Sequence, residues 1–171
     1  EFVCFNNISW IGNGLTIPSG PLRENLQRLK KYNNVFLIGN GENTEDIKNH
    51  ILNIDPNINI YEAKYIPLNI NEFEKKEKYL AFSGIGNHKT FISMLKINGL
   101  EIVKDLEFPD HYNYSKNDIE KINNVSKKLS CNIITTEKDF IRLNTNRVNE
   151  IKYVKTELKI MNEEKFFKVI S

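Results

Sequence analysis

The chain has 171 residues, 24 of them basic and 22 acidic, and a formal net charge of +2. This length is enough for a core that buries roughly 70% of the unfolded surface. The near balance of charge, with basic residues dispersed along the sequence, argues against nucleic acid as a partner. No run of about 18 apolar residues occurs, so we expect a soluble or peripheral protein.

The first predicted elements are a strand at residues 2–5, a Gly- and Pro-rich loop, and an amphipathic helix with a basic outer face. The inner face of this helix is marked by Leu22, Leu26 and Leu29. A strand at 35–38 follows. The next helix starts with Thr44 as its cap. Its apolar stripe consists of Ile47, Ile51 and Ile54.

Strands and helices then alternate to the end of the chain. Strands are predicted at residues 58–66, 79–82, 100–108 and 132–135. One helix carries Phe91 and ends at Gly99, and a second starts at Ser115 with Asp118 completing a capping box and Leu129 facing inward. The tail reads as a strand pair, 152–154 with 157–160, and a short helix. This alternation predicts an α/β fold, with a mostly parallel, doubly wound sheet and helices on both faces.

The two cysteines, Cys4 and Cys131, lie far apart in apolar, strand-like runs. We expect buried thiols in a reducing compartment, with no disulfide and no structural zinc. The chain starts without Met, directly in a strand-like segment. This start predicts the downstream part of a longer protein.

Three polar segments, 81–87, 108–112 and 135–139, each follow a predicted strand. The carboxyl ends of parallel strands meet at one edge of a sheet, where open α/β sheets bind ligands. We therefore expect the three segments to form one site.

Each segment has a chemical and a purely structural interpretation. Gly84, Gly86 and Asn87 precede a helix and leave backbone N–H groups that suit an anion, although a tight strand-to-helix turn is the commoner explanation of such glycines. His111, beside Asp110, can orient a group or accept a proton near neutral pH, or serve as an ordinary loop residue. The other two histidines, His50 and His88, are expected to face solvent.

The third segment ends in Glu137, Lys138 and Asp139. Thr136 as N-cap with Asp139 at the third helical position accounts for much of it structurally. Upstream, Arg23 and Glu24 stand at the start of a predicted helix. Arg23 suits a bidentate contact with phosphate or carboxylate, while the alternative is a surface ion pair worth under about 1 kcal/mol.

Together with Gly12-Asn13-Gly14 and the segment 18–24, these three segments resemble the tetraacyldisaccharide 4′-kinase family, in family order and from about residue 2 to about residue 145. The resemblance implies a P-loop NTPase-like kinase that uses ATP and Mg²⁺ to phosphorylate a lipid A disaccharide precursor in Gram-negative bacteria. It also implies a cytoplasmic protein, peripheral on the cytoplasmic face of the inner membrane and weakly attracted to its anionic surface.

The chain contains no Gly-x-x-x-x-Gly-Lys-Ser/Thr, the segment that cradles phosphates in such kinases. The resemblance therefore implies a C-terminal half: residues 1–31 as the end of the nucleotide-binding domain and 32–171 as a second α/β domain. ATP and Mg²⁺ would be held mainly by a missing N-terminal half, with no metal ligand in this chain, which alone should be inactive.

The resemblance also implies roles for single residues. His111, with Asp110, matches the segment carrying the histidine that pairs with a catalytic aspartate, and that aspartate is absent from this chain. The nucleotide- or substrate-binding residues implied are Arg23, Glu24, Gly84, Gly86, Asn87, Glu137, Lys138 and Asp139. Two other interpretations stay open: a stand-alone nucleotide- or sugar-binding module, and an inactive remnant of a split gene.

Overall fold

The computed structural model describes residues 1–40, 43–143 and 150–170. It divides into two compact units, one of Glu1–Tyr65 with Leu158–Ser171 and the other of Ile66–Glu157. A boundary after residue 31 does not appear, because residues on both sides of it share the core of the first unit. The assignment of residues 1–31 to a nucleotide-binding domain stays a prediction.

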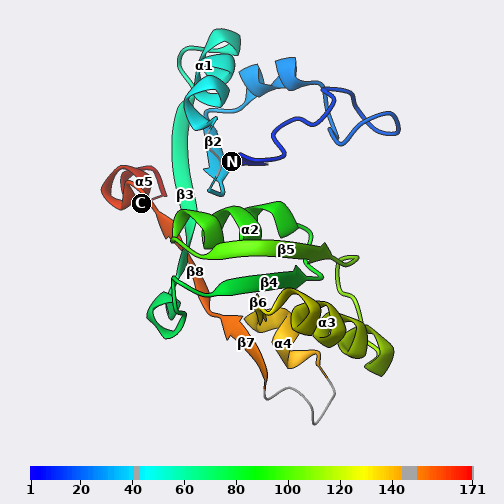
Figure 1. The fold of residues 1–171 in the computed structure, drawn as a ribbon. Helices are drawn as coiled ribbons and strands as arrows, with labels where there is room; N and C mark the ends of the chain where they lie inside the picture. Colours follow the sequence, from blue (N-terminus) through cyan, green and yellow to red (C-terminus); the bar gives the residue numbers. More distant parts are fainter. Residues whose placement is uncertain (41–42, 144–149, 171) are drawn as a thin grey trace. The chain divides into compact units, whose positions relative to one another are not determined.

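The first unit is built on a four-stranded sheet in the order β1-β2-β3-β8 (Figure 1). Its strands are β1 (Val3–Asn6), β2 (Asn34–Ile38), β3 (Asn59–Pro67) and β8 (Thr156–Ile160). The pairs β1–β2 and β2–β3 are parallel. The helix α1 (Thr44–Ile54) connects β2 to β3 and buries its predicted apolar stripe. The last helix is α5 (Glu163–Ile170).

The helix predicted around Leu22–Leu29 is shorter than expected. It is a single 3-10 segment, η1 (Leu26–Lys31), and begins after Asn25, whose side chain accepts a hydrogen bond from the N–H of Gln27. Arg23 and Glu24 therefore precede the helix. With only one apolar side chain, Leu29, fully buried, the segment has too little apolar contact to extend into a longer α-helix.

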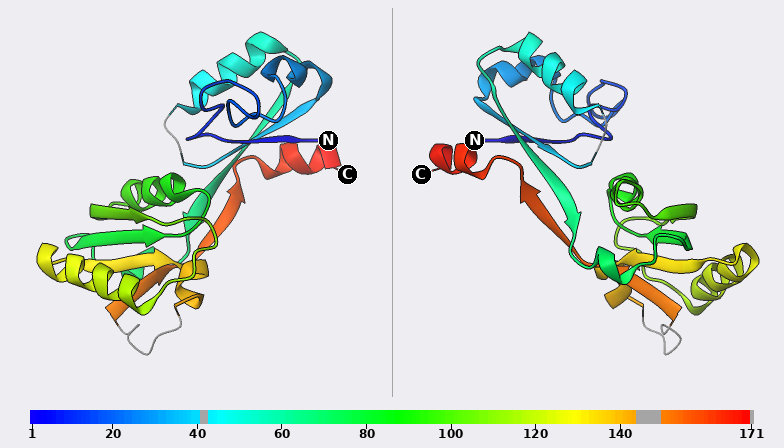
Figure 2. Two further views of the ribbon diagram at one scale, coloured as in Figure 1. Left: turned by 90° about the vertical axis from the view of Figure 1, so that its right-hand side faces the viewer. Right: turned by 60° about the vertical axis from the view of Figure 1, so that its left-hand side comes forward.

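The second unit is a four-stranded parallel sheet in the order β5-β4-β6-β7. Its strands are β4 (Lys78–Ser83), β5 (Glu101–Glu107), β6 (Asn132–Thr136) and β7 (Ile151–Val154). The helices α2 (His88–Ile97) and α3 (Lys116–Leu129) cover opposite faces of this sheet (Figure 2). Two short helices, η2 (Ile70–Glu72) and α4 (Glu137–Ile141), complete the unit. The predicted α/β class, with mostly parallel strands, is confirmed.

The strand β4 lies in the interior of this sheet and is covered on both faces. Tyr79, Leu80, Ala81 and Phe82 are all fully buried, as expected for a strand covered on both faces. Leu80 and Phe82 pack in a cluster with residues of α3. The apolar run in the sequence thus corresponds to a strand with no solvent face.

Three other expectations are wrong. β7 and β8, predicted as a pair, belong to different sheets. Cys4, on the edge strand β1, is exposed, Cys131 is partly buried, and both are free thiols. Leu129 at the end of α3 is 40% exposed instead of facing inward.

The capping box at the start of α3 forms as predicted. The Ser115 hydroxyl accepts from the N–H of Asp118, and the Asp118 carboxylate accepts from the N–H of Ser115. The Asp118 carboxylate also accepts from the Ser115 hydroxyl at 2.6 Å, and this bond, followed by the one from the Ser115 N–H, lowers the pKa of Asp118.

Replacing Ser115 by alanine is expected to lower the free energy of unfolding by about 1 kcal/mol, because one orphan N–H at the helix start loses its acceptor. Urea unfolding followed by circular dichroism measures this loss. Asn124→Ala, an exposed change on the same helix, is the control and should not destabilise. Equal stability of Ser115→Ala and the wild type would contradict the assigned cap.

Candidate functional site

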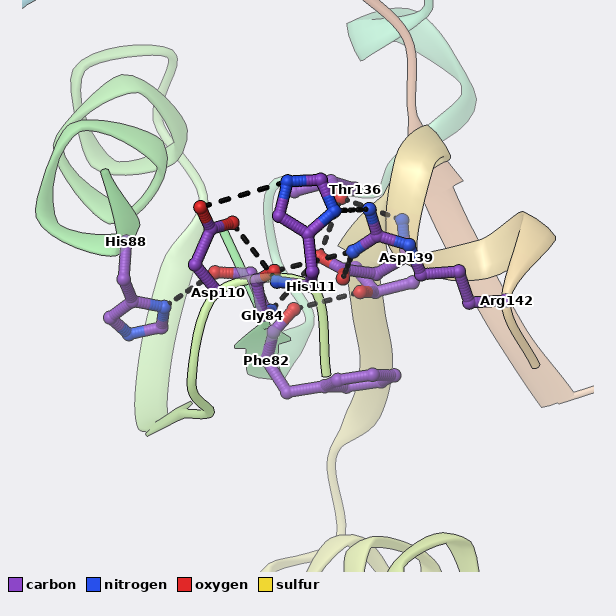
Figure 3. A network of polar contacts seen from close by, with 10 residues as sticks. Phe82, Gly84, His88, Asp110, His111, Thr136, Asp139 and Arg142 are labelled. Carbon is purple, nitrogen blue, oxygen red and sulfur yellow. Dashed lines mark hydrogen bonds and ion pairs between the residues drawn. The ribbon is translucent and has the colours of Figure 1, made fainter. Parts of the chain in front are cut away.

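The strand order of the second unit determines where a site can form. β4 is followed by α2 and then β5 on one side, and the chain returns through α3 to place β6 on the other side of β4. Ligands of open α/β sheets bind at such a reversal, outside the carboxyl ends of the strands. The three predicted segments leave β4, β5 and β6 at this edge, and Figure 3 shows that they meet there.

Gly84 makes backbone hydrogen bonds to both of the other segments of the site. Its N–H donates to Asp139 Oδ2 at 3.1 Å, and its carbonyl accepts from the N–H of His111 at 3.0 Å. The residue is tightly enclosed, since an added Cβ would lie 3.0 Å from the carbonyl oxygen of Pro109 and 3.1 Å from the Tyr114 hydroxyl. A side chain at position 84 therefore does not fit without movement of the His111 loop.

Gly84→Ala is expected to destabilise the protein by about 1–3 kcal/mol, the usual cost of overpacking. Thermal unfolding of the purified chain measures it. Gly86→Ala is the matched control, because a Cβ there would meet only Asp110, at an ordinary 3.7 Å. Similar unfolding temperatures for the two variants would contradict the enclosure of Gly84.

Asp139 is fully buried at the start of α4. Its Oδ2 accepts from the Gly84 N–H and from the Thr136 hydroxyl, at 2.7 Å, and its Oδ1 lies 3.5 Å from Arg142 Nη1. The Thr136 hydroxyl in turn accepts from the N–H of Asp139, as the predicted cap. Both oxygens of this buried carboxylate are engaged within the chain, so Asp139 joins the segments that follow β4 and β6. A contact of Asp139 with nucleotide stays a prediction.

His111 projects from the β5–α3 loop into solvent, with its side chain 68% exposed. Its backbone has φ +61°, in the left-handed region that residues other than glycine rarely adopt. The Asp110 carboxylate accepts from the His111 N–H at 3.0 Å, and its other oxygen lies 3.8 Å from Nε2 of the ring. The loop therefore presents the imidazole outward at the edge of the sheet.

Arg142, which the sequence interpretation missed, joins these groups. It is the C-terminal cap of α4, and its side chain is 20% exposed. Nη2 lies 3.0 Å from Nδ1 of His111, and Nη1 approaches the Gly84 carbonyl at 3.4 Å (Figure 3). Its spacing from Asp139, three residues along a helix, was the available signal in the sequence.

His88 is buried, contrary to the expectation that it faces solvent. Its Nδ1 lies 2.7 Å from the Ser83 hydroxyl and its Nε2 lies 3.3 Å from Asp105 on β5. The imidazole thus connects the end of β4 to β5 from the first turn of α2. His50 is exposed, as predicted.

The remaining predicted residues of this unit lie exposed at the starts of α2 and α4. Glu137 and Lys138 are exposed in the first turn of α4. Asn87 precedes α2, but its side chain makes no capping hydrogen bond.

Burial raises the pKa of Tyr114, and the nearby Asp139 carboxylate adds to this shift.

Arg23 and Glu24 belong to the first unit. Both are exposed and contribute to the lining of a cavity of about 600 Å³ beside β1. Glu24 pairs with Arg28 at 3.6 Å. The helix-start ion pair considered from the sequence is therefore made with a different arginine.

Within the described ranges, no group of three or more His, Cys, Asp or Glu side chains is arranged to hold a metal ion. In the same residues, no helix is long and apolar enough to cross a bilayer.

The fold and this edge define an α/β protein with a polar site at the strand-order reversal of a parallel sheet. The profile of the LpxK family, tetraacyldisaccharide-1-P 4′-kinase, matches residues 1–171. A tetraacyldisaccharide 4′-kinase of Pelagibacter ubique is 62% identical over 164 residues, which cover 96% of this chain and 52% of that protein. One from Rickettsia canadensis is 40% identical, covering 92% of this chain and 48% of its own.

Among solved structures, that of LpxK from Aquifex aeolicus, described as in complex with ATP, aligns with a TM-score of 0.53 at 22% identity. The alignment covers 99% of this chain and 50% of that one, and it supports the fold. The chain belongs to the tetraacyldisaccharide-1-P 4′-kinase family. It spans about half the length of the curated relatives it matches.

Proposed function

We propose that this chain is the C-terminal part of an ATP-dependent kinase that phosphorylates the 4′-hydroxyl of a tetraacyldisaccharide lipid A precursor. The match of the family profile over all 171 residues carries this proposal. The convergence of the Gly84, His111 and Asp139 segments at one sheet edge supports it, because a transferase needs such groups where substrates bind.

The chemistry divides between this chain and the part of its relatives that it does not span. Phosphoryl transfer depends on positioning and on neutralising the charge of the phosphates, usually by a P-loop lysine and Mg²⁺. Neither a P-loop in the sequence nor a metal-binding cluster among the described residues supplies this. We therefore infer that this chain alone does not catalyse phosphoryl transfer.

The residues of this chain have narrower roles in the proposal. His111, with Asp110 beside it, faces the reacting groups, and the exposed Glu137 and Lys138 contact nucleotide or the other half. The backbone N–H groups near Gly86 and Asn87 at the start of α2 suit an anionic group. In the first unit, Arg23 and Glu24 contact nucleotide or substrate from their cavity.

We place the protein in the cytoplasm, peripheral on the inner face of the membrane that contains its lipid substrate. The basic side chains Arg28, Lys30 and Lys31 lie in the last turn of η1. Basic groups near an anionic surface contribute about 1 kcal/mol each at most, and salt screens them. Any such attraction is therefore weak.

A chimera tests the function. The part of the Pelagibacter ubique kinase that aligns with this chain, at 62% identity, is replaced by this chain, and ATP-dependent phosphorylation of a tetraacyldisaccharide 1-phosphate is measured with a radiolabelled γ-phosphate. We expect turnover by the chimera and none by the isolated chain. A folded, ATP-binding chimera without turnover would contradict the proposal, and turnover by the chain alone would contradict the division between halves.

A further inference from the structure

The contact between Arg142 and His111 determines which nitrogen of the imidazole carries the proton. A guanidinium group is permanently protonated and contains only donors. Nη2 of Arg142 lies 3.0 Å from Nδ1 of His111. Nδ1 must therefore accept this hydrogen bond, so in the neutral ring the proton resides on Nε2.

The surroundings hold Arg142 in this position. Its other terminal nitrogen, Nη1, faces the Gly84 carbonyl at 3.4 Å and Asp139 Oδ1 at 3.5 Å. Asp139 is fully buried and is itself fixed by Thr136 and by the Gly84 N–H. The backbone N–H of His111 also donates to the Gly84 carbonyl. The backbone of His111 therefore contacts Gly84 directly, and its ring does so through Arg142.

The opposite tautomer is disfavoured by the same contact. A proton on Nδ1 would place two donors against each other at 3.0 Å and leave the guanidinium short of an acceptor. A histidine that acts as a base through Nε2 needs this Nδ1–H tautomer, because Nε2 must then be unprotonated. The ring as placed instead presents an Nε2–H donor on its exposed side, with Asp110 Oδ2 3.8 Å away.

We propose that Arg142 is a positioning residue that fixes His111 as the Nε2–H tautomer, so that His111 serves as a hydrogen-bond donor to an anionic oxygen and not as the base. The tautomer follows from this chain alone, while its part in the reaction rests on the proposed kinase function. The anionic oxygen is a carboxylate or a phosphate oxygen at the sheet edge.

Nitrogen-15 NMR of the purified 171-residue chain with labelled histidine tests the tautomer without any activity assay. The chain has three histidines, and His111→Gln assigns the signals of interest. We expect Nδ1 of His111 to be unprotonated and Nε2 to carry the proton at a pH where the ring is neutral. A proton on Nδ1 of the wild-type protein would overturn the proposal outright.

Variants then test whether Arg142 is the cause. Arg142→Met should give detectable Nδ1–H tautomer, whereas Arg142→Lys keeps a donor and should restore the wild-type pattern. Lys138→Met removes a positive charge from the same helix, without the contact, and should leave the ring signals unchanged. Unchanged tautomers in Arg142→Met would overturn the proposal. The buried His88 signals report whether the fold is intact; if Arg142→Met does not fold, the wild-type and Arg142→Lys spectra decide.

A second measurement in the active chimera separates positioning from substrate binding. Arg142→Met should lower kcat more than it raises KM, and the double variant with His111→Ala should be no slower than His111→Ala alone, because the two residues act as one unit. Additive losses would overturn the positioning role. An inactive chimera would contradict the proposed function while the NMR result stands by itself.

Discussion

Replacing His111 by alanine in the active chimera is expected to lower turnover by about 10²- to 10⁴-fold, the range for a positioned acid–base group. If the ring acts as a donor, the loss should lie toward about 10²- to 10³-fold. The side chain is 68% exposed, so the unfolding temperature should change little. Steady-state kinetics and thermal unfolding on the same preparation measure both.

Two residues assigned to binding provide the comparison variants for His111→Ala. Glu137→Ala and Arg23→Ala in the same chimera should raise KM more than they lower kcat, since each is exposed and outside the His111 contacts. Turnover close to that of the unmodified chimera for His111→Ala would remove the central residue of the proposed site.

Asp139→Ala is expected to have the largest effect on stability, about 3 kcal/mol or more. The change leaves Arg142 without its buried counter-charge and leaves the Gly84 N–H and the Thr136 hydroxyl without their acceptor. Urea unfolding of the isolated chain measures the loss. Asp139→Asn, which keeps the size and one acceptor oxygen, should lose less.

Glu137→Ala is the matched control for Asp139→Ala. It removes a carboxylate two residues earlier on α4 from an exposed position, and should change the free energy of unfolding by no more than about 0.5 kcal/mol. If the two variants unfolded alike, the Asp139 network would not be what holds the three loops together.

Local signals in the sequence were enough to predict most elements and the convergence of the three segments. The apolar run of β4 and the Ser115–Asp118 capping box each depend on neighbouring residues, and both formed as expected. A general rule about parallel strands places residues 84, 111 and 139 at the same edge of the sheet. Their direct contacts also require β5 and β6 to lie beside β4.

What the sequence did not reveal depends on contacts between distant segments. Arg142 reaches His111 only because β5 and β6 flank β4. His88 is buried because the first turn of α2 lies against Ser83 and Asp105. The separation of β7 and β8 depends on their partners, β6 and β3, which lie far away in the chain. None of these pairings leaves a periodic signal in the segments themselves.

The placement of β8 has a consequence for how the protein forms during synthesis. The second unit is one continuous stretch, Ile66–Glu157, whereas the sheet and core of the first are completed by β8 and by Phe166 of α5, which packs on Phe36 and Tyr61. Units generally fold as they leave the ribosome, the earlier one first. In this chain the later-starting unit has its full sequence first, so the aromatic core of the first unit stays unfinished until β8 and Phe166 have emerged.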